Sequence, residues 1–79
     1  MLTRPARYRI VVQGQLGPQW ADWFAGFRLS WQEPGQTVLV GTVVDQAALF
    51  GLLNTLRDLG LSLVEVLLLP PAENGAVDA

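Results

Sequence analysis

The sequence contains no cysteine and no histidine. Without cysteine the chain can form no disulfide, thiol nucleophile or thiolate metal site. The lack of histidine removes the most common general base and the most common metal ligand of proteins. A chain of 79 residues without these devices must be held together by the packing of one small core.

Charge is also scarce, since 15% of the residues are charged and 51% are hydrophobic. The net charge is −2, and every cation is an arginine. Two of the seven acids, Glu73 and Asp78, follow Pro70, so residues 1–69 carry equal numbers of acids and arginines. This balance of charge in residues 1–69 argues against nucleic-acid binding, which needs a basic surface. The apolar excess predicts either an unusually complete core or an apolar surface covered by another molecule.

Targeting signals are missing as well. No apolar stretch is long enough for a transmembrane helix. The N-terminal MLTRPARYR is charged, but the IVVQGQLG that follows turns polar too soon for a signal peptide. We therefore expect a cytoplasmic protein with no membrane partner and no nucleic-acid partner.

The middle third of the chain has the clearest pattern, which is strand (37–44), helix (45–60) and strand (61–69). Asp45 is a good N-cap for the helix, and Gly60 is suited to end it in a left-handed conformation. The helix carries one apolar stripe at i, i+3, i+4 and i+7, formed by Leu49, Leu52, Leu53 and Leu56.

The first half is predicted to supply two strands and a short helix. Residues 7–15 alternate in the manner of a strand, with Tyr8, Ile10 and Val12 facing the core. The segment PQWADWFA, which begins with Pro18, predicts a helix of about two turns that depends on burial of its aromatic face. A second strand over 27–32 is followed by a Pro-Gly turn, which predicts a hairpin with the next strand.

The resulting order β-α-β-β-α-β predicts an α+β, ferredoxin-like sandwich. Right-handed crossovers place both helices on one face of a four-stranded antiparallel sheet with spatial order 4-1-3-2. We expect a single domain over residues 7–69, a flexible N-terminal arm over 1–6 and a disordered C-terminal tail over 70–79.

The segments WADWF, VVDQAALFGLL and LRDLGLSL resemble those of a group of small, uncharacterised bacterial proteins. The resemblance covers roughly Tyr8 to Val66. It implies the ferredoxin-like topology, and it implies no activity, substrate or catalytic residue.

The last two strands are apolar on both faces, which is unusual for a sheet with one wet face. We expect Leu63, Glu65 and Leu67 on one side of the last strand, with Glu65 pairing with Arg7 or Arg9 of the first strand. An interface between copies, most simply a dimer, accounts for this pattern; ordinary apolar surface is the alternative. The candidate interface residues are Val38, Val40, Leu63, Glu65 and Leu67.

Three tryptophans, Trp20, Trp23 and Trp31, are candidates for an aromatic pocket, although aromatic residues at helical spacing usually belong to the core. The sequence does not say whether these side chains and Phe50 are exposed. Gly41, inside a strand, predicts a bulge or a close backbone approach. Gly51, inside the helix, predicts a tight contact with a neighbouring element.

These observations favour a non-enzymatic interaction or regulatory module that self-associates. An alternative is a sensor that binds a small metabolite at a dimer interface, for which the fold is the only warrant. We assign no catalytic, cofactor-binding or metal-binding residue and expect no cofactor, because the carboxylates have structural explanations and no partner base is present. An unknown protein partner is also compatible with the sequence.

Overall fold

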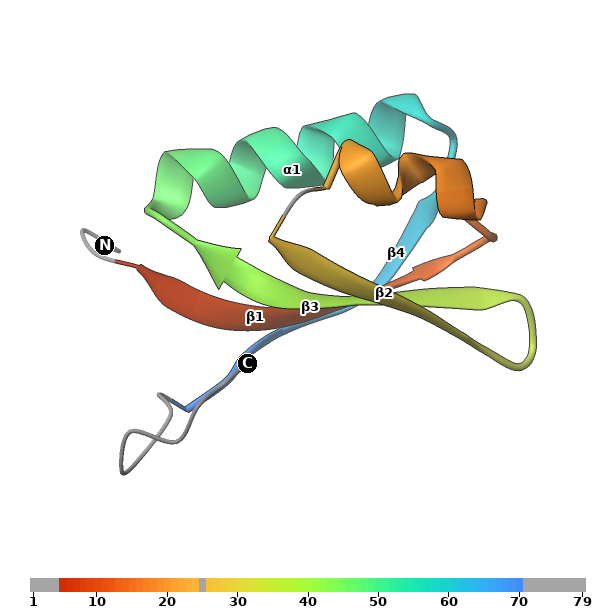
Figure 1. Cartoon of the computed structure of the whole chain (residues 1–79), viewed down its shortest axis with the longest axis horizontal. Coiled ribbons are helices and arrows are strands. Elements are labelled where there is room, and N and C mark those ends of the chain that lie inside the picture. The colour runs from red at the N-terminus through yellow and green to blue at the C-terminus, as the bar shows by residue number, and fades with distance from the viewer. Residues whose placement is uncertain (1–4, 25, 71–79) are drawn as a thin grey trace.

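The computed structural model describes residues 5–24 and 26–70, which form an α+β fold (Figure 1). Four antiparallel strands make one sheet in the order β2-β3-β1-β4. One α-helix, together with a short 3-10 helix, lies on one face of this sheet (Figure 1). The elements are β1 (Ala6–Gln13), η1 (Pro18–Asp22), β2 (Phe27–Gln32), β3 (Gln36–Val43), α1 (Gln46–Asp58) and β4 (Ser62–Leu68). The expected arm over 1–6 and tail over 70–79 fall largely outside the described residues.

The expected ferredoxin-like pattern with two helices is wrong in its first half. Pro18 begins a helix as predicted, but the helix is a five-residue 3-10 segment. Gly17 at its N-cap provides no side-chain hydrogen bond, and its first turn has no acidic residue. A segment this short does not recover the cost of nucleating an α-helix. The strand order is nevertheless the one expected, because the β1–β2 connection still crosses over β3.

The helix α1 has the caps that the sequence predicts. The Asp45 carboxylate accepts a hydrogen bond from the Ala48 backbone N–H at 2.8 Å. At the other end Gly60 takes a φ of 85°. The backbone N–H groups of Gly60 and Leu61 donate to the carbonyls of Arg57 and Leu56, at 2.9 and 3.1 Å. This pair of bonds is a Schellman motif, which satisfies carbonyls left open at the end of the helix.

The core lies between the helical layer and the middle of the sheet. The predicted inward set of β1, Tyr8, Ile10 and Val12, is buried there. Leu39 from β3 and Leu56 from α1 are also almost completely buried. The predicted leucine stripe of α1 is confirmed, since all four of its members belong to the core or pack against it. Apolar burial at this level is the main source of stability for the chain.

The polar side chain of Thr37 is fully buried. Its hydroxyl donates to the Gly14 carbonyl at 2.7 Å and accepts from the Leu16 backbone N–H at 3.1 Å. Both capacities of the hydroxyl are therefore used, which avoids the cost of an unsatisfied buried polar group. These bonds fasten the loop after β1 to β3.

The two glycines singled out in the sequence have different roles. A Cβ built on Gly41 would lie 2.5 Å from the Gly26 carbonyl oxygen, so the predicted close backbone approach is confirmed. A Cβ on Gly51 would meet no atom within 4 Å. The predicted tight contact at Gly51 is therefore wrong, because this side of α1 borders open space and not another element.

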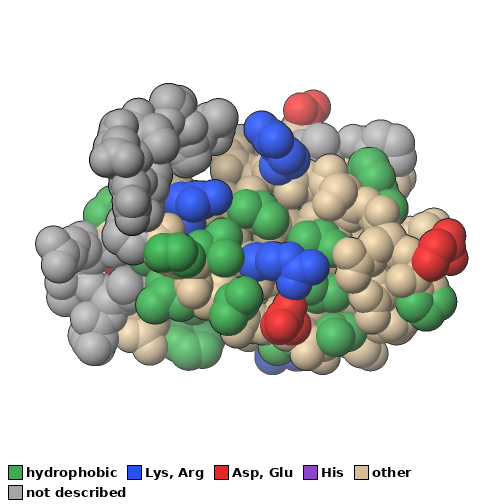
Figure 2. Space-filling model, turned by 90° about the horizontal axis from the view of Figure 1, so that it is seen from below, with side chains coloured by type: hydrophobic (Ala, Val, Ile, Leu, Met, Phe, Trp, Pro, Cys, Tyr) green, Lys and Arg blue, Asp and Glu red, His purple; other side chains and the backbone are tan. Residues whose placement is uncertain are grey.

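The sheet face opposite the helices carries mixed side chains (Figure 2). At one end, three glutamines form a hydrogen-bonded chain across the strands. Gln32 Nε2 donates to Gln36 Oε1 at 3.1 Å, and Gln36 Nε2 donates to Gln13 Oε1 at 3.3 Å. Gln13 Nε2 then donates to the Pro34 carbonyl in the hairpin turn at 2.8 Å. Farther along, hydrophobic side chains gather around arginine and acidic side chains (Figure 2).

Candidate interaction surface along β4

The strand β4 forms one edge of the sheet and pairs with β1 on its inner side. Within residues 5–24 and 26–70, no strand pairs with its outer side. All seven of its residues are exposed. An exposed edge strand presents unpaired backbone N–H and C=O groups, which makes it a template for another strand.

The side chains of β4 are as apolar as a core strand. Its five exposed apolar residues keep between 37% and 57% of their surface accessible, and they make up half of the ten large hydrophobic residues found exposed in the described part of the chain. These five are Leu63, Val64, Val66, Leu67 and Leu68. This exposed apolar surface makes β4 a candidate interaction surface.

The helical layer covers this edge only in part. Val66 lies opposite Ile10 and Leu68 lies opposite Tyr8, so these β4 residues share the sheet face on which the helices pack. Ile10 is completely buried, whereas Val66 is 37% exposed. The helix α1 reaches β4, but the covering of the sheet is less complete over β4 than over β1.

A β-bulge changes which face each β4 residue occupies. Glu65 lies opposite Val11, but Leu63 lies opposite Val12, because the register shifts between those two β1 residues. The expectation that Leu63 shares a face with Glu65 and Leu67 is therefore wrong. One extra residue in the bulge reverses which face the following side chains occupy. Strict alternation along the sequence, which the prediction assumed, does not show such a bulge.

The predicted ion pair at Glu65 is confirmed, with Arg9 as the partner. Arg9 Nη1 lies 2.5 Å from Glu65 Oε1, on the face away from the helices, and both side chains are partly exposed. Glu65 is the one charged residue of β4. The edge strand is therefore close to neutral, and a second molecule meets no net charge on it.

The two candidate interface residues on β3 offer much less surface. Val38 is only 5% exposed, and Val40 is partly buried. Val38 lies between Ser30 and Val11 in neighbouring strands, which enclose it on both sides. The accessible apolar surface is therefore concentrated on β4.

The three tryptophans do not form one pocket. The Trp20 and Trp23 rings lie 5.6 Å apart and are tilted by 58°. Trp31 lies apart from them, and its indole N–H donates to the Leu16 carbonyl at 2.8 Å. Trp20 packs against the core, whereas Trp23 is 68% exposed and Trp31 and Phe50 are about half exposed.

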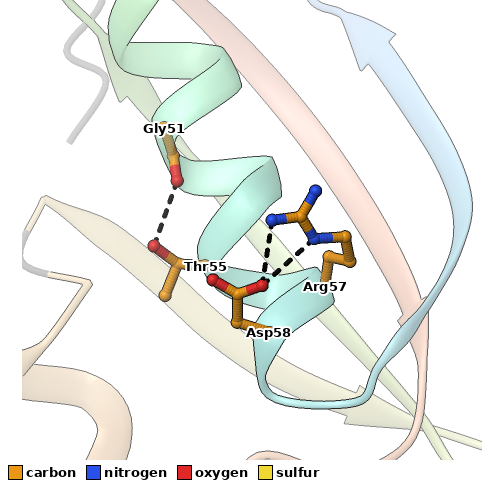
Figure 3. Close-up of polar contacts among 4 residues, drawn as sticks. All are labelled: Gly51, Thr55, Arg57 and Asp58. Atoms are coloured by element: carbon orange, nitrogen blue, oxygen red, sulfur yellow. Dashed lines mark hydrogen bonds and ion pairs between the residues drawn. The ribbon is translucent and has the colours of Figure 1, made fainter.

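Two shallow hollows adjoin these rings. The hollow at Trp31 has a volume of about 380 Å³ and is also lined by Gln15, Leu16 and Gly17. The hollow at Trp23 has a volume of about 310 Å³, and α1 contributes Gly51, Leu52 and Thr55 to it. The Thr55 hydroxyl donates to the Gly51 carbonyl at 3.0 Å (Figure 3). Neither hollow includes a residue of β4.

The carboxylates of Asp45 and Asp58 have structural roles. Asp45 caps α1. Asp58 accepts from the neighbouring Arg57 at 3.0 and 3.1 Å, on an exposed helix end (Figure 3). In the described part of the chain, no three residues of the metal-binding types come together in a way that would hold an ion.

No helix within residues 5–24 and 26–70 has the length and hydropathy needed to cross a bilayer. No curated protein and no solved structure matches the chain. A family model described as Domain of unknown function (DUF8691) matches residues 7–67, from β1 through most of β4. The chain therefore belongs to this family of unknown function.

Proposed function

We propose that the protein is a non-enzymatic interaction module that self-associates along β4. The observation that carries this proposal is an edge strand with five exposed apolar side chains and an outer side with which no strand of the described residues pairs. Two strand edges that meet complete a hydrogen-bond ladder and bury these side chains in the same step. The module would then act through its assembly and not through chemistry at a site.

The size of the apolar surface suits a reversible association. Burying a half-exposed valine or leucine side chain is worth about 1 kcal/mol. Five such side chains on each of two copies give at most about 10 kcal/mol, which lies within the range of roughly 4–15 kcal/mol that association costs. Ladder hydrogen bonds add a further favourable contribution, so we expect a dimer whose population depends on protein concentration.

The other sheet edge favours a closed dimer over a filament. The edge strand β2 carries Arg28, Ser30 and Gln32 on one face, and all three are exposed. Pairing of β2 with β4 of another copy would repeat head to tail and give open chains. Pairing of β4 with β4 instead joins two neutral apolar edges and leaves the polar edge in water.

The alternative proposal, a metabolite sensor with its site at a dimer interface, has less support. The two hollows lie beside Trp23 and Trp31 and are lined by residues outside β4. A ligand held there would not touch the proposed contact. A ligand in either hollow would therefore have to influence association by changing the conformation of the chain, because it would not bridge two copies directly.

The proposal is tested by measuring mass in solution across micromolar concentrations, by light scattering or native mass spectrometry. We expect a dimer for the natural chain and a monomer for Leu67→Glu, because a second carboxylate on this strand adds negative charge that nothing in the contact balances. Arg28→Lys is the matched control, since Arg28 and Leu67 lie in one row across the sheet through Val40 and Arg9. A natural chain that stays monomeric throughout would refute the proposal.

A further inference from the structure

We propose that the two copies pair through antiparallel β4 strands, with the two-fold axis passing through Val66. This inference rests on the proposed self-association and specifies its geometry. The sheets of both copies would then join into one continuous antiparallel sheet, with both helical layers on the same side. Three observations on β4 favour this register over one centred on Glu65.

The first observation is the direction of the backbone groups. The Leu69 N–H donates to the Arg7 carbonyl at 2.9 Å, so the backbone groups of Leu69 point toward β1. Backbone groups alternate in direction along a strand. No register shift occurs between Leu68 and Glu65, and so the groups of Leu68 and Val66 point outward. Val66 is therefore placed to exchange both hydrogen bonds with its counterpart in a second copy.

The second observation is the position of the one charge. A register centred on Glu65 would place two carboxylates opposite each other at the closest kind of antiparallel pair, with Cα atoms about 4.5 Å apart. Like charges in this position are destabilising. A register centred on Val66 places Glu65 opposite the partner subunit's Leu67, and each carboxylate keeps its own Arg9.

The third observation is the bulge. The register with β1 shifts between Val11 and Val12, which places the irregular part of β4 between Glu65 and Leu63. Pairing centred on Glu65 would carry the ladder across this irregular part in both copies. Pairing centred on Val66 uses mainly the regular stretch from Glu65 to Leu68. Regular strands pair with fewer lost hydrogen bonds than bulged strands.

Single cysteines test this register, because the natural chain has none. In a Val66-centred pair the two Val66 Cα atoms lie about 5.5 Å apart, which suits a disulfide. Val66→Cys should therefore cross-link under mild oxidation. We expect about tenfold or more disulfide dimer than for Glu65→Cys, whose two copies lie diagonally apart, because paired thiols react at an effective concentration near millimolar. Ser30→Cys lies on the opposite edge of the sheet and measures how much disulfide dimer forms by random collision.

The outcomes separate the register from the self-association. Circular dichroism first confirms that each variant folds, and scattering gives the mass of the reduced protein. If Glu65→Cys cross-links better than Val66→Cys, the register is wrong and the self-association stands. If the reduced protein is dimeric and neither β4 cysteine exceeds Ser30→Cys, the contact lies elsewhere and the register is refuted. A monomeric reduced protein refutes both proposals.

Discussion

Replacement of Gly51 by alanine should stabilise the protein, because Gly51 lies inside the helix α1. Glycine in a helix interior is less favourable than alanine by about 1 kcal/mol, because it loses more backbone freedom on folding. The added methyl group would meet nothing within 4 Å. The hydrogen bond from the Thr55 hydroxyl goes to the backbone carbonyl of Gly51, so the substitution leaves it in place.

The gain should be close to the full difference in helix propensity. For a domain of this length, about 1 kcal/mol raises the melting temperature by roughly 4–8 °C. Thermal and urea unfolding followed by circular dichroism measure the change, at a protein concentration held constant because association also stabilises the folded state. An unchanged or lower melting temperature for Gly51→Ala would show that the surroundings of Gly51 are filled, and would refute the reasoning.

Two other glycines give controls in which the same substitution has the opposite sign. Gly41→Ala has no room, since its Cβ would lie 2.5 Å from a backbone oxygen of Gly26. We expect a loss of about 1–3 kcal/mol, typical of overpacking. Gly60→Ala has room, but the residue takes a φ of 85°. A left-handed alanine costs about 1–2 kcal/mol, so this variant separates backbone strain from steric contact.

Three further substitutions test separate parts of the fold by the same unfolding measurements. Asp45→Ala removes the N-cap bond to Ala48 and should cost about 1 kcal/mol; no change would mean that water replaces the cap without loss. Leu56→Ala leaves a cavity at an almost completely buried position and should lower the free energy of unfolding by about 2–5 kcal/mol. A loss below about 1 kcal/mol would contradict the assignment of Leu56 to the core. Arg9→Ala breaks a partly exposed ion pair and should cost no more than about 1 kcal/mol, so a larger loss would show that Arg9 holds the sheet face together.

The sequence predicts the sheet and α1 well because their signals are local. The alternation of Tyr8, Ile10 and Val12 and the leucine stripe of α1 each repeat with the period of the element that contains them. Asp45 and Gly60 then set the two ends of the helix. Strand order follows from the handedness of the crossovers, which needs no detail of side chains.

The features that the sequence does not predict depend on contacts between distant parts of the chain. The segment from Pro18 to Asp22 has helical spacing. Because the segment is short, its surroundings determine whether it forms an α-helix or a 3-10 helix. The bulge in β4 arises from pairing with β1, and it moves Leu63 to the other face. The open space beside Gly51 depends on where Trp23 and Phe27 lie, and neighbouring sequence gives no signal for it.

On the candidate surface, the pairing of Glu65 and the apolar character of β4 are visible in the sequence, because opposite charges on adjacent strands and missing alternation are both local patterns. The burial of Val38 is not visible there. Val38 lies in a strand that β1 and β2 flank, and this position within the sheet is set by pairing with distant parts of the chain.

The amide chain that runs from Gln32 through Gln36 to Gln13 has a mechanical consequence. It ends on the Pro34 carbonyl, and beside it the Gly14 backbone N–H donates to the Gly35 carbonyl at 2.7 Å. The tip of the β2–β3 hairpin is thus tied to the end of β1. Fraying of the hairpin must then pull on β1, and amide protons at both places should exchange with solvent in a single opening event.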